Sequence, residues 1–186
     1  MNGLALLSER QITAILLIAC GLIFTVGGIL FTGRVMWQWP AGTTPGYLRW
    51  ERGSIILAVL VTAFGLVLLE DLLRTAGDSV VARLGMVTYL IGAVIVIVAE
   101  TSYLDNRQWV YSQTVLYVLL ALISQAAFGL SLLQTGLVPR WAGWATLNWN
   151  LFWLVFLPIT ARHDMYYPAL HHTAPLIIGI ALLTSG

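Results

Sequence analysis

The sequence predicts an all-α protein, a single polytopic bundle of about six membrane-spanning helices. Of the 186 residues, 59% are hydrophobic and only 9% are charged, whereas soluble proteins carry about 25% charged residues. Several apolar runs also approach roughly 20 residues, the length at which a helix crosses a hydrocarbon core about 30 Å thick. These runs lack the alternation of a membrane β-barrel. The connectors between them are short and leave no room for a second domain.

The first helix is expected to be a retained span rather than a signal peptide. Arg10 comes late, the apolar run from Ile12 to Phe31 exceeds a typical signal-peptide core, and no A-x-A site follows. A connector rich in Trp, Pro and Gly then leads to the second helix, which ends near Glu70 and Asp71. The six helices are expected at about 11–33, 53–73, 79–102, 110–134, 139–160 and 168–185.

The later helices are separated by short turns. A connector with Gly77 and Asp78 precedes the third helix, and the YLDNRQW turn follows it. Between the fourth and fifth helices, Gly136 stands where a helix C-cap is expected, and Pro139 stands where the next helix can start.

The last segment is too short to span the membrane from Thr173 onward. A start at Pro168, a favoured first-turn residue, gives about 18 residues, near the lower limit for a span. Pro175 would then kink the helix. The alternative is five spans followed by a half-inserted segment.

Alternation of the helices sorts the polar residues onto two membrane faces. We call the end that holds the start of the first helix face one and the opposite end face two. Glu70 and Glu100 end consecutive antiparallel helices, so we expect them at opposite faces and not as a carboxylate dyad. The arginines divide almost evenly and give no orientation by the positive-inside rule. Face two holds all three histidines together with Arg34, Arg49, Glu51, Arg52, Glu100, Asp105, Arg107, Arg162 and Asp164.

Glu100 and a histidine-rich segment form the first candidate site, at face two. An ionisable group near membrane depth indicates a functional role, here as a proton acceptor, a metal ligand or a partner for Arg107. Imidazole and carboxylate groups bind zinc, iron or copper. The alternative is an interfacial position, with Glu100 reached by water and the histidines at headgroup level. The metal set is Glu100, His163, Asp164, His171 and His172.

Helix geometry limits this metal set. Adjacent His171 and His172 point about 100° apart on a helix, so both bind one ion only if that turn is irregular. Bis-histidine haem is disfavoured, because it needs imidazoles on two facing helices, whereas the histidines all lie between His163 and His172. A metal ion is the cofactor that this segment would suit.

The second candidate site lies near the midplane, between the fourth and fifth helices. The polar side chains there are Ser124 and Gln125 in the fourth helix and Thr146, Asn148 and Asn150 in the fifth. Such groups commonly hydrogen-bond across helices in lipid, which is the packing interpretation. The functional interpretation is a pocket in which Trp rings hold a flat apolar ligand, such as a quinone, a lipid or a pigment. Its residues are Gln125, Asn148, Trp149, Asn150 and Trp153.

The loop tryptophans indicate a compact cap over face two. Trp37, Trp39 and Trp50 accompany two prolines and two glycines in the first connector, and exceed the number that an interfacial aromatic belt needs. The cap would cover a site or dock a partner subunit.

Two segments resemble the uncharacterised bacterial membrane families of the DUF4386 type. One is LLQTGLVPRWAGWATL, and the other is PLIIGIALL, with its proline at the head of the last helix. The resemblance implies a bundle of about six spans and assigns no catalytic residues.

Three functions fit these observations. The first is a non-enzymatic protein, either an accessory subunit of a membrane assembly or a binder of an apolar ligand. The second is a metal-dependent membrane enzyme, and the third is a small oligomeric transporter or channel. The expected location is the bacterial inner membrane, with the lipid bilayer and other subunits or copies of the chain as partners. The net charge of +1 argues against nucleic acid.

Overall fold

The computed structural model describes residues 7–39, 46–78, 80–108, 110–160 and 172–185, and all regular structure within these ranges is helical. The predicted all-α bundle is confirmed. The first four helices are each long and apolar enough to cross a membrane. The helices are α1 (Glu9–Val35), α2 (Tyr47–Thr75), α3 (Val81–Asn106), α4 (Tyr111–Thr135), α5 (Arg140–Thr160) and α7 (Thr173–Thr184).

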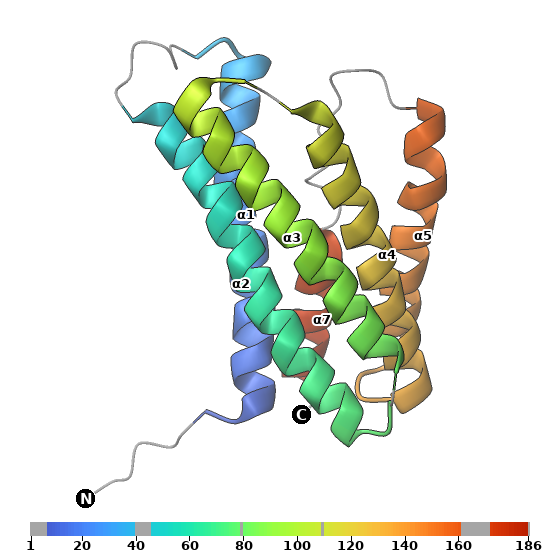
Figure 1. Ribbon diagram of the computed structural model, residues 1–186. Helices are drawn as coiled ribbons and strands as arrows, with labels where there is room; N and C mark the ends of the chain where they lie inside the picture. Colours follow the sequence, from blue (N-terminus) through green and yellow to red (C-terminus); the bar gives the residue numbers. More distant parts are fainter. Residues whose placement is uncertain (1–6, 40–45, 79, 109, 161–171, 186) are drawn as a thin grey trace, which may run out of the picture.

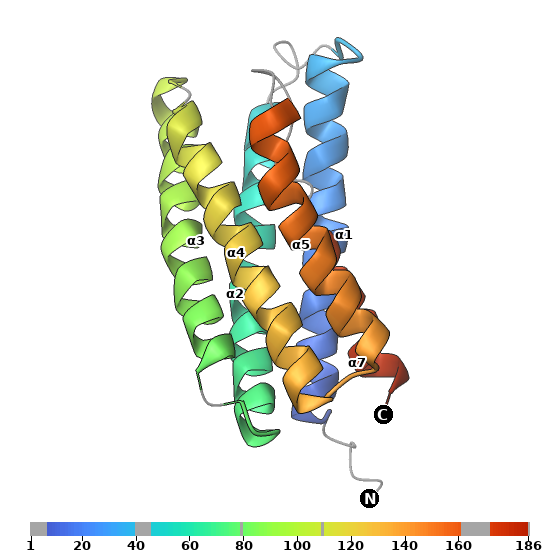
Figure 2. The ribbon, with the colours of Figure 1, turned by 90° about the vertical axis from the view of Figure 1, so that its right-hand side faces the viewer.

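The six helices form a closed ring. Each of α1 to α4 packs against the helix that follows it in the chain. The described helix α7 then closes the ring by packing against both α5 and α1. Figures 1 and 2 show the long helices running side by side, with α7 in the half of the bundle that also holds the start of α1. The side chains that fill the interior are mainly Leu, Val, Ala, Tyr and Phe, and Leu17, Leu66, Tyr89, Phe128 and Ile178 are almost fully buried.

Glycines allow α4 and α5 to approach closely. A Cβ at Gly129 would lie 2.6 Å from the backbone nitrogen of Leu147, and a Cβ at Gly143 would lie 2.8 Å from the Leu133 side chain. Small residues at such crossings are typical of membrane helices, because association there depends on close packing. These contacts also fix how far α5 slides along α4.

The second helix begins at Tyr47 rather than near residue 53, so the expected connector is too long. The prediction was wrong there because Glu51 and Arg52 are charged, and charge in an apolar chain indicates a loop. In the structure these two side chains lie inside the bundle and neutralise each other and their neighbours. Gly46, with φ of 82°, provides the left-handed residue at which the chain turns into the helix.

The last helix is half the length of a span. Its 12 residues extend about 18 Å at 1.5 Å per residue, against a hydrocarbon core of about 30 Å. At its start, the ring of His172 stacks on Phe24, midway along α1, with ring centroids 4.1 Å apart. At its end, Arg10 donates to the Leu182 carbonyl at 3.0 Å and to the Ser185 hydroxyl. Among the described residues, α7 is therefore a short apolar helix.

The expected kink at Pro175 is wrong for the helix that the structure describes. The helix begins at Thr173, so Pro175 lies in its first turn, where no preceding carbonyl within the helix requires its missing N–H. The expected start at Pro168 lies outside the described residues.

A matched pair of glycine substitutions tests the α4–α5 packing. Gly129→Ala should lower the midpoint of thermal unfolding in detergent, because the new Cβ overlaps the Leu147 backbone. Overpacking of this kind costs about 1–3 kcal/mol. Gly53→Ala is the control, because a Cβ there meets nothing within 4 Å and alanine favours a helix by about 1 kcal/mol. Equal midpoints for the two variants would contradict the close approach.

Candidate functional site

A chain of ion pairs joins α1, α2 and α3 at face two. Arg34 makes a two-pronged contact with Glu51, with both nitrogen–oxygen distances at 2.8 Å. Arg52 contacts the same Glu51 at 3.1 Å and also contacts Glu100 at 2.9 Å. The guanidinium of Arg52 lies 4.5 Å from the centre of the Tyr103 ring. Two acids and two arginines thus alternate along one connected path.

Most of this network is out of reach of solvent and lipid. Glu51, Arg52 and Glu100 are 0%, 1% and 2% exposed, while the Arg34 side chain is 25% exposed. An uncompensated charge in such a place is costly. The two positive and two negative charges cancel, so the network has no net charge. Its position, within two helical turns of the ends of α1, α2 and α3, makes it a clamp between them.

Glu100 pairs with Arg52 and not with Arg107, which was the partner in one of the three interpretations that the sequence left open. Arg107 ends α3 with φ of 61° and its side chain is exposed. The interpretation of Glu100 as a carboxylate reached by water is also wrong, since it is only 2% exposed. Glu70, as expected, belongs to the other face, where it pairs with Arg83 at 3.3 Å.

Below the charge network, hydroxyl groups in the core have partners. Thr62 donates to the Ala58 carbonyl at 2.8 Å. The Tyr89 and Tyr117 hydroxyl oxygens lie 3.5 Å apart, with both side chains 0% exposed. These hydroxyl groups are hydrogen-bonded within the protein, so no ligand is required to satisfy them.

A second set of buried polar side chains, on α4 and α5, contains atoms that are not hydrogen-bonded. Six side-chain atoms are buried and have no hydrogen-bond partner in the part of the chain that the structure describes. Ser124, Gln125, Thr146 and Asn150 are each 0% exposed, and Trp153 is half-buried. The atoms are Ser124 Oγ, Gln125 Nε2 and Oε1, Thr146 Oγ1, Asn150 Oδ1 and Trp153 Nε1.

The α4–α5 contacts place these residues together. Gly129 packs on Leu147 in an antiparallel pair, so one turn further along each helix, Gln125 and Asn150 lie at the same level. Thr146 and Trp153 lie one turn to either side of Asn150. Ser124 precedes Gln125 on α4 and lies where Gly85 of α3 also approaches that helix. We call these five residues the α4–α5 polar cluster.

The two hydroxyl groups of the cluster are unusual within this chain. Thr13, Thr25 and Thr62 all donate to the carbonyl four residues earlier, at 2.8 Å in each case. That bond is the usual way to satisfy a hydroxyl inside a membrane helix. Ser124 and Thr146 do not make it, so their hydroxyls lack the partner that the other three have.

Aromatic rings on α5 flank the cluster. The Trp149 and Trp153 ring centroids are 5.8 Å apart, and Phe152 and Phe156 each lie within 6 Å of Trp153. The structure thus brings four of the expected pocket residues together, namely Gln125, Trp149, Asn150 and Trp153. Asn148 is exposed and lies apart from them. Ser124 and Thr146 belong to the set of midplane polar residues that the sequence indicated, and both are 0% exposed.

Most of the expected metal set cannot be placed. His163, Asp164 and His171 lie outside the described residues. Within the described residues, no group of three or more His, Cys, Asp or Glu side chains is close enough to hold a metal ion. His172 is buried at 4% exposure against Phe24, and Glu100 is engaged by Arg52.

The three cap tryptophans divide into two places. Trp37 and Trp39 follow α1, with ring centroids 5.4 Å apart. The Trp39 ring lies directly on Gly33, where a Cβ would approach it to 2.1 Å. Trp50 is not in a connector but in α2, and it is 75% exposed.

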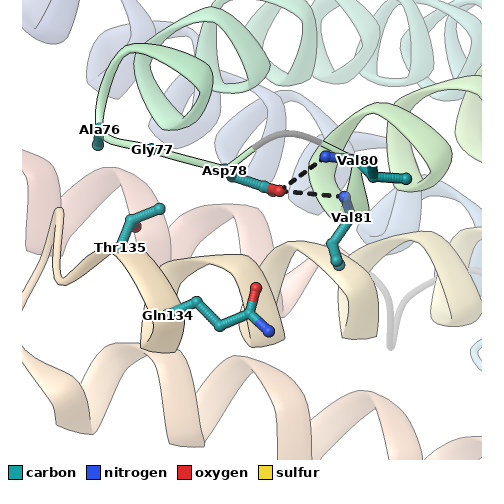
Figure 3. Close-up of a pocket in the computed structure, with 7 residues that line it drawn as sticks. All are labelled: Ala76, Gly77, Asp78, Val80, Val81, Gln134 and Thr135. Atoms are coloured by element: carbon teal, nitrogen blue, oxygen red, sulfur yellow. Dashed lines mark hydrogen bonds between the residues drawn. The ribbon is translucent and has the colours of Figure 1, made fainter.

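Asp78 forms a separate polar site at face one, beside a hollow of about 170 Å³. Figure 3 shows its carboxylate directed at the start of α3, with Gln134 and Thr135 of α4 across the hollow. It accepts hydrogen bonds from the Val80, Val81 and Ala82 amides at 3.0, 3.1 and 2.7 Å, and from the Ser131 hydroxyl. Burial raises the pKa of Asp78, but these hydrogen bonds outweigh it and the net pKa is lowered.

The fold and these sites define a polytopic helical membrane protein with a neutral buried charge clamp and a separate interior polar cluster. No protein-family model, curated protein or solved structure matches the chain. The resemblance to DUF4386-type proteins therefore stays a prediction.

A double-mutant cycle tests the charge clamp. Arg52→Met and Glu100→Leu should each destabilise the protein by about 3–5 kcal/mol, because each leaves the buried network with one uncompensated charge. The double variant restores neutrality, since Arg34 still pairs with Glu51, and should be more stable than either single variant. The exposed Arg83–Glu70 pair is the control, with a coupling of about 0–1 kcal/mol. Additive losses at Arg52 and Glu100, measured by thermal unfolding, would contradict the clamp.

The lowered pKa of Asp78 predicts a stability loss in acid. An aspartate has an unfolded pKa of about 3.9. A folded pKa below that value gives stability that is present above pH 3.9 and is lost as pH falls through the folded pKa. Asp78→Asn should remove this contribution, so the difference in stability between wild type and variant should shrink below about pH 4. Asp105→Asn, at an exposed position, should show no such convergence when unfolding is followed by circular dichroism.

Proposed function

We propose that this chain is a non-enzymatic integral membrane protein that binds an apolar ligand through the α4–α5 polar cluster. The observation that carries the proposal is the group of six buried polar atoms without hydrogen-bond partners in the described structure. The resemblance noted in the sequence supports a bacterial inner-membrane location.

The energetics favour an occupant for this cluster. Leaving a buried donor or acceptor unsatisfied costs about 1–3 kcal/mol per group. The combined cost of six such atoms is therefore comparable to the whole free energy of unfolding of a typical domain. Folded proteins pair most buried polar groups with protein or ordered water. A ligand head that reaches Gln125, Asn150 and Trp153 would satisfy several of these groups at once.

The donors and acceptors of the cluster indicate which kind of ligand would fit it. Gln125 offers both a donor and an acceptor, Asn150 an acceptor and Trp153 a donor, and none of the cluster residues is charged. Such a site matches a neutral head with carbonyl or hydroxyl groups and not an ionised phosphate. The adjacent Trp149 and Phe152 rings suit a flat or extended apolar body. A quinone or a neutral lipid has both parts.

Co-purification tests the proposal. Protein purified from native membranes in mild detergent should yield one neutral lipophilic molecule, enriched over bulk lipid when the extract is analysed by mass spectrometry. Asn150→Leu and Gln125→Leu should lower that enrichment at least tenfold, because they remove the buried polar groups that hold the ligand head. Circular dichroism checks that each variant stays folded.

Asn148→Leu is the matched control, since it makes the same change two residues away at an exposed position. It should leave the enrichment unchanged. Absence of any enriched molecule, or equal losses in Asn148→Leu and Asn150→Leu, would contradict the proposal.

A further inference from the structure

A groove runs along the outer side of α1 and α2, away from the α4–α5 polar cluster. It has a volume of about 690 Å³. Its walls are mainly apolar, and Arg49 is the charged side chain among the residues that line it. The lining residues are Ile23, Val26, Gly46, Arg49, Trp50, Gly53, Ser54 and Leu57.

The groove runs from face two toward the middle of the membrane. Gly46 immediately precedes α2 and Leu57 lies 11 residues further along, which corresponds to about 16 Å of helix. Val26 and Leu57 are 53% and 49% exposed, so the outer surface here is apolar and in contact with lipid. Trp50, 75% exposed near the start of α2, suits the headgroup level at which tryptophan concentrates.

Gly53 opens the groove. A Cβ at this position meets no atom within 4 Å, so the missing side chain leaves room at the helix surface. By contrast, a Cβ added at Gly27 on α1 would lie 3.0 Å from the Ser54 hydroxyl oxygen. The space at Gly53 is therefore on the outer side of the helix pair, not within their contact.

Arg49 differs from the other arginines at this end of α1 and α2. Arg34 and Arg52 are both held by Glu51. Arg49 is exposed and makes no ion pair with any described residue. A free guanidinium at headgroup level, above an apolar groove, presents one positive charge where a phospholipid carries its phosphate.

We propose that the α1–α2 groove binds an anionic phospholipid, with its phosphate on Arg49 and an acyl chain along Gly53 toward Leu57. Charge complementarity selects the headgroup, and the apolar walls hold the chain. This site is independent of the ligand proposed for the α4–α5 polar cluster, which is neutral and interior.

Lipid retention tests this proposal. The full chain is reconstituted in nanodiscs of phosphatidylglycerol and phosphatidylcholine in equal amounts, released into detergent, and examined by native mass spectrometry. Wild type should retain phosphatidylglycerol in preference to phosphatidylcholine. Arg49→Gln should reduce that preference about fivefold, in line with the contribution of one basic residue near an anionic surface.

Two further variants separate the groove from general surface charge. Arg107→Gln removes another exposed arginine at face two and should leave the preference unchanged, because Arg107 does not line the groove. Gly53→Leu adds a side chain to the lining of the groove, from a Cβ that itself meets no atom within 4 Å, and should reduce retention of both lipids. Equal effects of Arg49→Gln and Arg107→Gln, or full retention in Gly53→Leu, would overturn the proposal.

Discussion

The rest of the bundle depends on the position of Arg52 between two buried carboxylates. Glu51 and Glu100 come from neighbouring helices, and Arg52 contacts both, at 3.1 and 2.9 Å. Because charges at this depth are tolerated only when balanced, α2 and α3 are held in the one register that brings these groups together. Arg34 extends the constraint to α1. The same neutralisation lets α2 begin at Tyr47 with charged residues on its inner side.

Hydropathy predicts the helices, because span length and apolar composition are local properties of the chain. It misplaces the start of α2 for a physical reason. The charges of Glu51 and Arg52 look like a loop in the sequence, and their compensation depends on Arg34 and Glu100, which lie far along the chain. The same limit applies to Glu100, since Arg107 is near it in sequence whereas Arg52 is near it in space. Partners across helices cannot be read from spacing within one helix.

The candidate ligand site shows what the sequence could and could not supply. Polar residues within apolar runs are visible at once, and Gln125 and Asn150 were identified in this way. Which of two nearby asparagines faces inward depends on the rotation of α5, and Asn148 is exposed while Asn150 is 0% exposed. That rotation is set by Gly129 and Gly143 at the α4–α5 contact. The missing partners of Ser124 and Thr146 are likewise a property of the assembled helices.

The short α7 has a consequence for the energetics of a helix that begins within a bilayer. The first turn of any helix leaves several amide N–H groups without a carbonyl partner. In the hydrocarbon core of a bilayer there is no water to accept hydrogen bonds from these groups. Proline at position 175 carries no amide hydrogen, so one of these unmet donors does not exist. Substituting it with alanine would add an amide hydrogen in the first turn, where the helix itself offers no carbonyl to bind it. A residue usually regarded as a helix breaker here makes a helix start tolerable where no solvent can assist it.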